Sequence, residues 1–173
     1  CIVKHLITIW FVITGFIFAQ EEGLYAPAPP ADAAFVRIIH ASPDAATVPA
    51  TVGDTAYGEV SFAQVSPYRV VLQGARTLTA GDVTQDLEVQ AGKFYSLAIT
   101  PGGVVVLEDA SSTNRAKALL LLYNLSDIPT VDLKTTDGKT EVFSGVAPGT
   151  QTSVEVNGIT VDLAVSSEDT VLQ

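Results

Sequence analysis

The stretch Ala118–Gly138 reads ALLLLYNLSDIPTVDLKTTDG, and an earlier stretch, Phe35–Gly53 (FVRIIHASPDAATVPATVG), has the same layout. Each copy runs from an apolar strand into a polar corner, passes through a turn that contains proline, and ends in a strand rich in threonine and valine. The corners are His40-Ala-Ser42 and Asn124-Leu-Ser126, which lie 84 residues apart. A period of roughly 80 residues is too long for a solenoid repeat and indicates two copies of one small domain.

Short apolar or alternating runs divided by glycine, proline and aspartate fill the chain from residue 35 onward. This pattern is typical of β-strands, and no helical periodicity is sustained there. The dipeptides Asp137-Gly138 and Asn157-Gly158 lie between such runs and predict hairpins, the second of them leading into a strand over 159–165. The sequence therefore predicts an all-β protein of two consecutive small antiparallel β-sandwich domains joined by a short linker.

Changes in composition set the expected boundaries. We expect a signal peptide over 1–19, a proline-rich extended leader over 20–34, an N-terminal β-sandwich domain over 35–108, a polar linker over 109–117 and a C-terminal β-sandwich domain over 118–173. The first copy continues through a further pair of strands after the point that Val165 matches, whereas the second has only eight residues left. We therefore expect the sequence to be truncated at both ends and the second domain to lack its final strand pair.

The N-terminus has the pattern of a secretory signal. Leu6–Ala19 is almost entirely apolar and follows Lys4, so we expect export and cleavage between Ala19 and Gln20. The alternative is an uncleaved anchor helix that begins at Ile2. Cys1 precedes the apolar run, and no other cysteine occurs. The mature chain therefore has neither disulfides nor a thiol nucleophile.

The charge is acidic and evenly spread. The formal net charge of the 173 residues is −10, and the basic residues Arg37, Arg69, Arg76 and Lys93 are scattered along the chain. Such a surface repels polyanions, so we expect no binding of nucleic acid.

The corner His40-Ala-Ser42-Pro-Asp44 contains the residue types of a catalytic triad. Residues two apart on a strand are separated by roughly 6.5 to 7 Å, which places their side chains beyond hydrogen-bond reach of one another. The second copy has Asn124 and Ser126 in these places, and neither is a base at neutral pH. We interpret His40, Ser42, Asn124 and Ser126 as structural corner residues and expect no catalytic residue.

Other chemistry has little support in the sequence. No Gly-Asp-Ser nucleophile with a later histidine, no phosphate-binding loop and no dinucleotide fingerprint is present, so we expect no cofactor. Asp86 with Glu88, or Asp54 with Glu59, could form a weak calcium site, but the chain lacks a calcium-binding loop of the Asp-x-Asp-x-Asp-Gly type, and we expect no metal site.

Several segments, taken in their order and with the signal peptide and the repeat, make the chain resemble the AlgF family of alginate biosynthesis proteins. These segments are Leu24-Tyr-Ala-Pro27 leading into Ala34-Phe-Val-Arg37, then Leu120–Asp127 (LLLYNLSD), Val131–Lys134 (VDLK), Thr136–Thr140 (TDGKT), Val146–Pro148 (VAP) and Val161–Val165 (VDLAV). The resemblance covers nearly the whole mature chain.

The resemblance implies a periplasmic adaptor that is required for O-acetylation of mannuronate residues in alginate. It implies as partners a membrane-bound acyltransferase and periplasmic SGNH-like acetylation proteins, with alginate itself bound weakly if at all, and it supplies no catalytic or cofactor-binding residue.

A generic surface module is the alternative. The segment Arg37–Asp44 also resembles a motif, Arg-x-x-His-Ala-Ser-Pro-Asp, of a widespread family of cell-surface sandwich domains. A carbohydrate-binding module would need exposed aromatic side chains, for which the candidates are Tyr25, Tyr57, Tyr68, Tyr95 and Tyr123. We expect Tyr95 and Tyr123 to be core residues, and an acidic surface disfavours a polyuronate.

Overall fold

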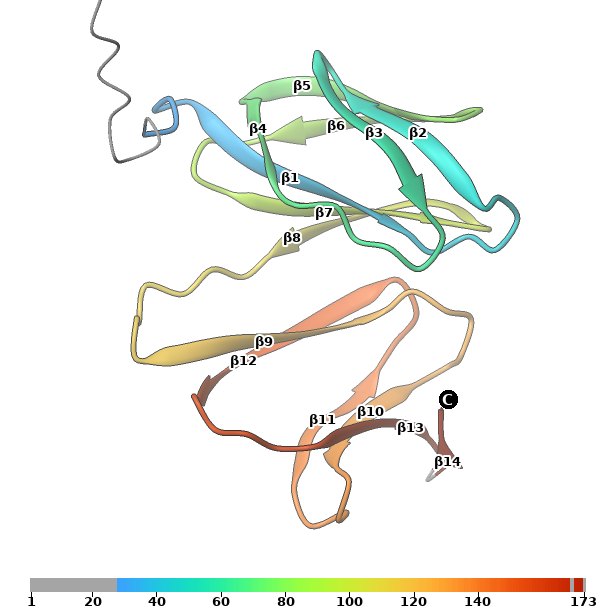
Figure 1. Cartoon of the computed structure of the whole chain (residues 1–173), viewed down its shortest axis with the longest axis vertical. Coiled ribbons are helices and arrows are strands. Elements are labelled where there is room, and N and C mark those ends of the chain that lie inside the picture. Colours follow the sequence, from blue (N-terminus) through green and yellow to red (C-terminus); the bar gives the residue numbers. More distant parts are fainter. Residues whose placement is uncertain (1–27, 169, 173) are drawn as a thin grey trace, which may run out of the picture.

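The computed structural model describes residues 28–168 and 170–172, which form two β-sandwiches stacked along the long axis of the molecule (Figure 1). The described residues contain no helix able to cross a membrane. The expected signal peptide, its cleavage site between Ala19 and Gln20, and the leader up to residue 27 lie outside the described residues.

The N-terminal sandwich packs a sheet of order β4-β1-β7-β8 against a sheet of order β3-β2-β5-β6. Its strands are β1 (Ala33–His40), β2 (Thr47–Val52), β3 (Thr55–Ser61), β4 (Arg69–Leu72), β5 (Gly74–Ala80), β6 (Val83–Val89), β7 (Phe94–Thr100) and β8 (Gly103–Asp109). The expected antiparallel β-sandwich architecture is confirmed, with one exception in the pairing, because β1 and β7 run parallel. Between β1 and β7 the chain passes through the other sheet. Such a crossover connection lets it return to the first sheet in the same direction, as a parallel pair requires.

Alternation along the strands builds the core of this sandwich. The inner face of β1 buries Val36 and Ile38 completely, and β7 adds Leu97. Ser96 and Ala98, on the opposite face of β7, are also fully buried. Ser96 is covered because the C-terminal sandwich packs on this outer face and brings Tyr123 to the cluster in which Ser96 is hydrogen-bonded.

The C-terminal sandwich packs a two-stranded sheet, β12-β9, against a sheet of order β11-β10-β13-β14. Its strands are β9 (Lys117–Asn124), β10 (Val131–Thr135), β11 (Glu141–Val146), β12 (Thr150–Asn157), β13 (Leu163–Ser167) and β14 (Thr170–Val171). Its smaller core buries Val131, Leu133, Phe143 and Val146.

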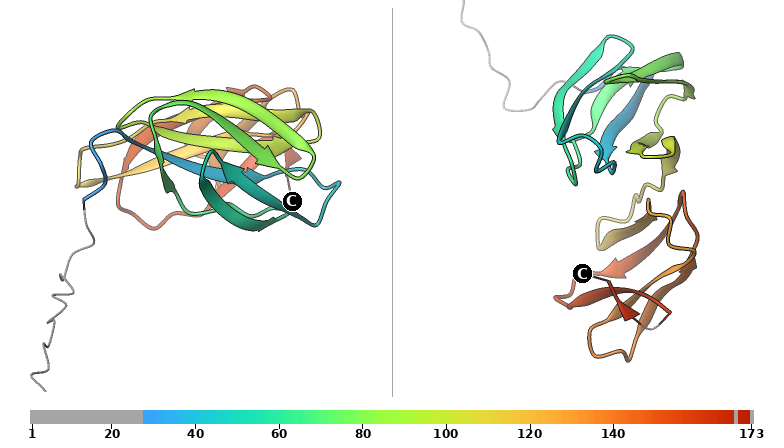
Figure 2. Two further views of the ribbon diagram at one scale, coloured as in Figure 1. Left: turned by 90° about the horizontal axis from the view of Figure 1, so that it is seen from above. Right: turned by 90° about the vertical axis from the view of Figure 1, so that its right-hand side faces the viewer.

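Strand pairing shows that the two sandwiches are copies of one design. The pairs formed among β1 to β6 recur, with the same orientations, among β9 to β14: β9 pairs with β12 as β1 pairs with β4, and the order β11-β10-β13-β14 repeats β3-β2-β5-β6. No strand among the described residues corresponds to β7 or β8. Figure 2 shows that the C-terminal sandwich is the smaller of the two.

In the C-terminal copy one expected hairpin is confirmed, whereas the other hairpin and the start of one strand are wrong. Asp137-Gly138 connects β10 to β11, which pair as an antiparallel hairpin. Asn157-Gly158 does not form the expected hairpin, because β12 and β13 belong to different sheets and the chain must cross between them. The strand expected over 159–165 begins only at Leu163, opposite Thr135 at the end of β10, so that Ile159 and Val161 remain exposed.

The run of four leucines in β9 lies between the two sandwiches. Leu120 and Leu122 pack on the core of the C-terminal sandwich. Leu119 and Leu121 point the other way and border a small pocket with Arg37, Tyr68 and Phe94 of the N-terminal sandwich. A strand that is covered on both faces has apolar residues at successive positions, which explains why apolar and polar residues do not alternate along β9.

The contribution of the N-terminal core is testable with one pair of substitutions. Leu78 on β5 is fully buried and Leu72 on β4 is about half exposed. We expect Leu78→Ala to lower the free energy of unfolding by about 2–5 kcal/mol, because the truncation leaves a cavity. Leu72→Ala, the same truncation, should cost less than about 1 kcal/mol because little buried area is lost. Denaturant unfolding measures both, and equal losses would contradict this assignment of the core.

Candidate functional site

The first corner is closed by hydrogen bonds to the backbone. His40 is fully buried at the end of β1, and its Nε2 lies 3.0 Å from the carbonyl oxygen of Ala45. The amide of Ser42 points at His40 Nδ1 from 3.4 Å. Nδ1 therefore accepts and Nε2 donates, which is the pattern of a neutral imidazole. Both ring nitrogens are occupied by the turn that the ring supports.

The second corner replaces the imidazole with an amide. Asn124 is buried at the end of β9, and its Nδ2 donates to the carbonyl oxygens of Ile128 and Val146 at 2.9 and 3.0 Å. Its Oδ1 accepts from the Ser126 amide at 3.2 Å and from the Ser126 hydroxyl at 2.8 Å. Asn124 thus forms hydrogen bonds with backbone groups of its turn, as His40 does in the first copy.

The geometry of the first corner does not activate a nucleophile. The Ser42 hydroxyl donates to Asp44 at 3.0 Å, so these side chains do meet, contrary to the spacing argument from an extended strand. They meet because the chain turns after Ala41, and a turn shortens the distance between residues two apart. The serine proton points at a carboxylate, which is a weak base, and the imidazole that would be the usual general base contacts the backbone instead.

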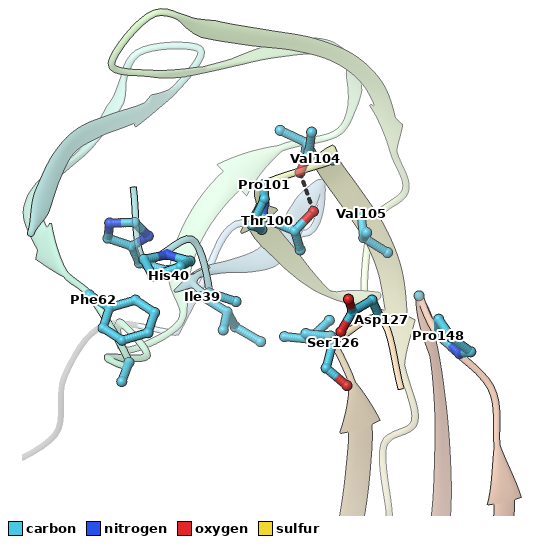
Figure 3. Close-up of a pocket in the computed structure, with 17 residues that line it drawn as sticks. Ile39, His40, Phe62, Thr100, Pro101, Val104, Val105, Ser126, Asp127 and Pro148 are labelled. Atoms are coloured by element: carbon cyan, nitrogen blue, oxygen red, sulfur yellow. Dashed lines mark hydrogen bonds between the residues drawn. The ribbon is translucent and has the colours of Figure 1, made fainter. Parts of the chain in front are cut away.

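Both corners border one groove of about 880 Å³ between the sandwiches (Figure 3). Ile39, His40 and Phe62 lie on one side, and Ser126, Asp127 and Pro148 lie on the other. The turn from Thr100 to Val105 forms part of the wall. Asp127 is the only carboxylate in the lining, and no lysine or arginine contributes. The groove therefore suits apolar side chains and offers no cation to an anionic sugar.

A buried polar cluster joins the sandwiches beside this groove. The Asp109 cluster consists of Arg37, Tyr68, Ser96, Asp109 and Tyr123. Asp109 accepts hydrogen bonds from Tyr68 and Ser96 on one oxygen and from Tyr123 on the other. Arg37 donates to Ser96 and to Tyr123, each at 2.7 Å, and its Nη2 lies 3.6 Å from the carboxylate. Tyr123 belongs to β9, so the cluster connects the two sandwiches through a side chain of each.

Charge and ring stacking reinforce the cluster. The Arg37 guanidinium lies 4.6 Å from the centre of the Tyr68 ring and 5.6 Å from that of Tyr123, distances at which cation–π attraction operates. Burial, and then the hydrogen bond to Asp109, raise the pKa of Tyr68 and of Tyr123 above the usual range for a phenol. Both hydroxyls therefore remain neutral donors near pH 7.

Sequence reasoning missed this cluster. Asp109, assigned to the linker, is the last residue of β8 and is buried, while Arg37 was grouped with the scattered basic residues. Two signals were available: an arginine in the middle of an apolar strand needs a partner, and the leucine run of β9 indicates a second packed face. The connecting segment is 110–116, and Gln151 and Glu155 of β12 hydrogen-bond to Glu108 and Ser112 across it.

Comparison with known proteins matches this architecture to one family. The family described as alginate O-acetyl transferase AlgF matches residues 10–173. The chain is 33% identical to the alginate biosynthesis protein AlgF of Pseudomonas syringae pv. tomato over 88% of this chain and 68% of that protein. The AlgF proteins of Pseudomonas aeruginosa and Azotobacter vinelandii are each 32% identical, over 85% of this chain and 67% of theirs. The chain belongs to the AlgF family.

The other candidate residues of this AlgF family member are placed as follows. Tyr57 and Tyr95 are buried, Tyr68 and Tyr123 belong to the Asp109 cluster, and Tyr25 lies outside the described residues. None of the four described tyrosines is free to stack on a sugar ring. Among the described residues, no three histidine, cysteine, aspartate or glutamate side chains lie close enough to hold a metal ion. Asp86 accepts a hydrogen bond from Thr77.

The Asp109 cluster predicts that substitutions at two adjacent acidic residues, Asp109 and Glu108, differ in their effect on stability. Asp109→Asn keeps the shape but removes the buried charge that faces Arg37, so we expect a loss of about 3 kcal/mol in the free energy of unfolding. Glu108→Gln is the matched control: its pair with Lys93 is exposed and screened by water, so its loss should change the free energy of unfolding little. Trypsin cleavage after Arg115 or Lys117 should also become faster in Asp109→Asn alone. Equal effects of the two variants would show that the cluster does not hold the sandwiches together.

Alkaline pH should weaken the same cluster. Because the folded-state pKa of Tyr68 and of Tyr123 is raised, their contribution to stability is complete below the ordinary phenol pKa of about 10 and is lost as pH rises above it. Tyr57, whose pKa burial also raises, contributes in the same direction. The double variant Tyr68→Phe, Tyr123→Phe should therefore lose less stability between neutral and alkaline pH than the parent. Denaturant unfolding at several pH values tests this, and an unchanged alkaline loss would contradict it.

Proposed function

We propose that this protein is a non-catalytic adaptor required for O-acetylation of mannuronate residues in alginate, linking a membrane-bound acyltransferase to periplasmic SGNH-like acetylation and export proteins. Membership of the AlgF family supports the connection with alginate acetylation. The observation that carries the non-catalytic role is the corner at His40: both nitrogens of the only histidine after residue 5 contact the backbone.

The name of the family contains the word transferase, so the alternative of an enzyme has to be weighed. Acyl transfer needs an activated nucleophile and a site that stabilises the developing oxyanion. Ser42 donates to a carboxylate, and Ser126 donates to the side-chain oxygen of Asn124, so neither hydroxyl faces a histidine or lysine that could act as its base. This arrangement favours a non-catalytic accessory protein over an acyltransferase.

A carbohydrate-binding module is the second candidate, and it has less support. Several basic side chains among the described residues already pair with carboxylates: Arg37 with Asp109, Lys93 with Glu108, and Lys139 with Asp137. A polyuronate is itself anionic and would approach a protein whose net charge is −10. The apolar lining of the groove between the corners suits protein side chains better than an acidic sugar.

The adaptor works in the periplasm in this proposal, because the N-terminal apolar segment has the form of an export signal. We propose that its partners are held at a fixed distance. The Asp109 cluster and the hydrogen bond from Gln151 to Glu108 connect the two sandwiches, and Glu155 accepts a hydrogen bond from Ser112 of the connecting segment. Two partners on a rigid body keep one relative orientation, whereas partners on a flexible tether are joined only by a raised effective concentration.

The test replaces the native protein in its own host with the double variant His40→Gln, Ser42→Ala. An adaptor should leave acetylation of the polymer within about twofold of the parent, whereas loss of an acid–base residue from an enzyme costs about 10²-fold or more. Ser153→Ala, at an exposed position on β12, controls for the manipulation. Polymer acetylation is measured together with the amount of folded protein, so that instability is not mistaken for lost chemistry.

A second measurement addresses the adaptor directly. The mature protein, isolated from its host, should carry the other acetylation proteins with it and should transfer no acetyl group by itself. Acetyl transfer to mannuronate oligomers by the purified protein, or loss of acetylation in the folded double variant, would replace this proposal with the enzyme alternative.

A further inference from the structure

One aromatic side chain of the N-terminal sandwich lines the groove between the corners and is only partly covered. Phe62 follows β3 and is 45% exposed, although its ring packs edge-on against the buried ring of His40, with 6.0 Å between the ring centres. Val65, on the same connection between β3 and β4, is exposed as well. Exposed aromatic and aliphatic side chains that border a groove are typical of sites that bind another molecule.

The backbone that carries Phe62 is fixed by hydrogen bonds. The Phe62 amide donates to the carbonyl oxygen of Ala46 at 2.8 Å. The Ala63 amide donates to the carbonyl oxygen of His40 at 2.9 Å, and the His40 amide donates to that of Gln64 at 3.0 Å. The turn is thus tied to the first corner. Its backbone is already ordered before a ligand binds, which lowers the entropy cost of binding.

The same turn contains a strained residue. Ala63 lines the groove and has a left-handed backbone conformation, with a φ of 61°. Residues with a Cβ atom rarely adopt this conformation, because Cβ approaches the carbonyl oxygen that follows it. Strain of this kind persists where the surrounding structure fixes it, and it occurs most often at functional sites. The strain at Ala63 and the exposure of Phe62 are separate observations on one turn.

The charge of the groove indicates the chemistry of its ligand. Asp127 is exposed on the wall opposite Phe62, and none of the described lysine or arginine side chains lines the groove (Figure 3). Asp44, which follows the lining residue Pro43, is a second exposed carboxylate at the first corner. A positive charge on the ligand complements these carboxylates. A polyuronate or a second copy of this acidic chain lacks that complementarity.

We propose that the groove binds an extended segment of a partner protein that carries apolar side chains and a lysine or arginine. The apolar side chains pack against Phe62 and Pro148 on the two walls, and the cation pairs with Asp127. The volume of about 880 Å³ is in the range of sites that enclose a ligand of a few side chains. The inference rests on the proposed adaptor function, in which the partners are acetylation proteins, and it names the feature that one of them presents.

Three short peptides test this chemistry on the mature protein. The first is a chain of glycine and serine in which two leucines flank one lysine; the second has glutamate in place of the lysine, and the third has serine in place of the leucines. The first peptide should bind on the order of tenfold more tightly than the other two. Its binding should shift the amide resonances of Ala63, Gly102 and Gly149, which line the groove.

Several results of this titration would overturn the proposal. Equal affinity of the three peptides would show that neither the apolar side chains nor the charge is recognised. Resonance shifts confined to residues outside the groove would place the binding elsewhere. Absence of binding of the first peptide up to about 10 mM would show that the groove does not take such a segment.

A pair of charge reversals separates the carboxylate in the groove from the charge of the whole protein. Asp127→Lys and Asp54→Lys change the net charge equally, and Asp54 is exposed in the turn between β2 and β3, outside the groove lining. Asp127→Lys should weaken the lysine peptide by about threefold or more and strengthen the glutamate peptide, whereas Asp54→Lys should do neither. Equal effects of the two variants would show that only the overall charge attracts the peptide, and would overturn the proposal.

A pair of truncations tests the apolar contact. Phe62 is 45% exposed and Leu72, outside the groove lining, is 46% exposed, so the two side chains are matched in exposure. Phe62→Ala should weaken the lysine peptide on the order of tenfold or more, and Leu72→Ala should leave its affinity within about twofold of the parent. Equal effects would overturn the proposal. Denaturant unfolding checks that both variants are folded, and Asp127→Lys, at an exposed position, tests the site even where Phe62→Ala is unstable.

Isolation from the host separates this inference from the adaptor proposal. The folded Asp127→Lys variant should carry about threefold less, or lower still, of one acetylation protein than the parent, and Asp54→Lys should match the parent. If all variants carry these proteins equally, the groove is not the docking site while the adaptor proposal stands. If the parent carries none of them, the adaptor proposal fails, and the peptide results alone decide the chemistry of the groove. Self-association of the parent that Phe62→Ala abolishes would identify a second copy as the occupant and would overturn the inference.

Discussion

A buried carboxylate sets the arrangement of the whole molecule. Asp109 is at the end of β8, away from water, where an ionised group is tolerated only if hydrogen bonds and an opposite charge replace its hydration. The protein supplies these from Arg37, Ser96, Tyr68 and Tyr123. Because Tyr123 comes from the other sandwich, separating the two halves would leave a charge partly unsatisfied. The cost of that state favours the docked arrangement of the two sandwiches.

The fold was largely readable from the sequence because strand patterns and the repeat are local signals. The corners at His40 and Asn124, the absence of helical periodicity and the turn at Asp137-Gly138 all led to the right class of structure. The parallel pairing of β1 with β7 was not readable, since alternation defines the faces of a strand but not its neighbours. The role of Asp109 was missed for a related reason: its burial depends on Tyr123, and composition places it in a polar segment.

The two corners show how one structural task is met by different chemistry. His40 and Asn124 both end a central strand, and both hydrogen-bond the backbone of the turn that follows. A histidine in one copy and an asparagine in the other therefore serve through the same donor and acceptor geometry. The groove between the corners is lined mainly by apolar side chains.

The pairing of β1 with β7 also determines when the protein can fold. Phe35 and Phe94 are opposite one another although 59 residues separate them, and the intervening chain builds the whole of the other sheet. Closing so long a loop costs entropy before any contact compensates for it, and topologies dominated by such pairings fold slowly. A chain that emerges from its N-terminus therefore exposes the edge of β1 until nearly the entire first half has been released. The sheet that contains β1 can therefore be completed only after β7 and β8 have been released.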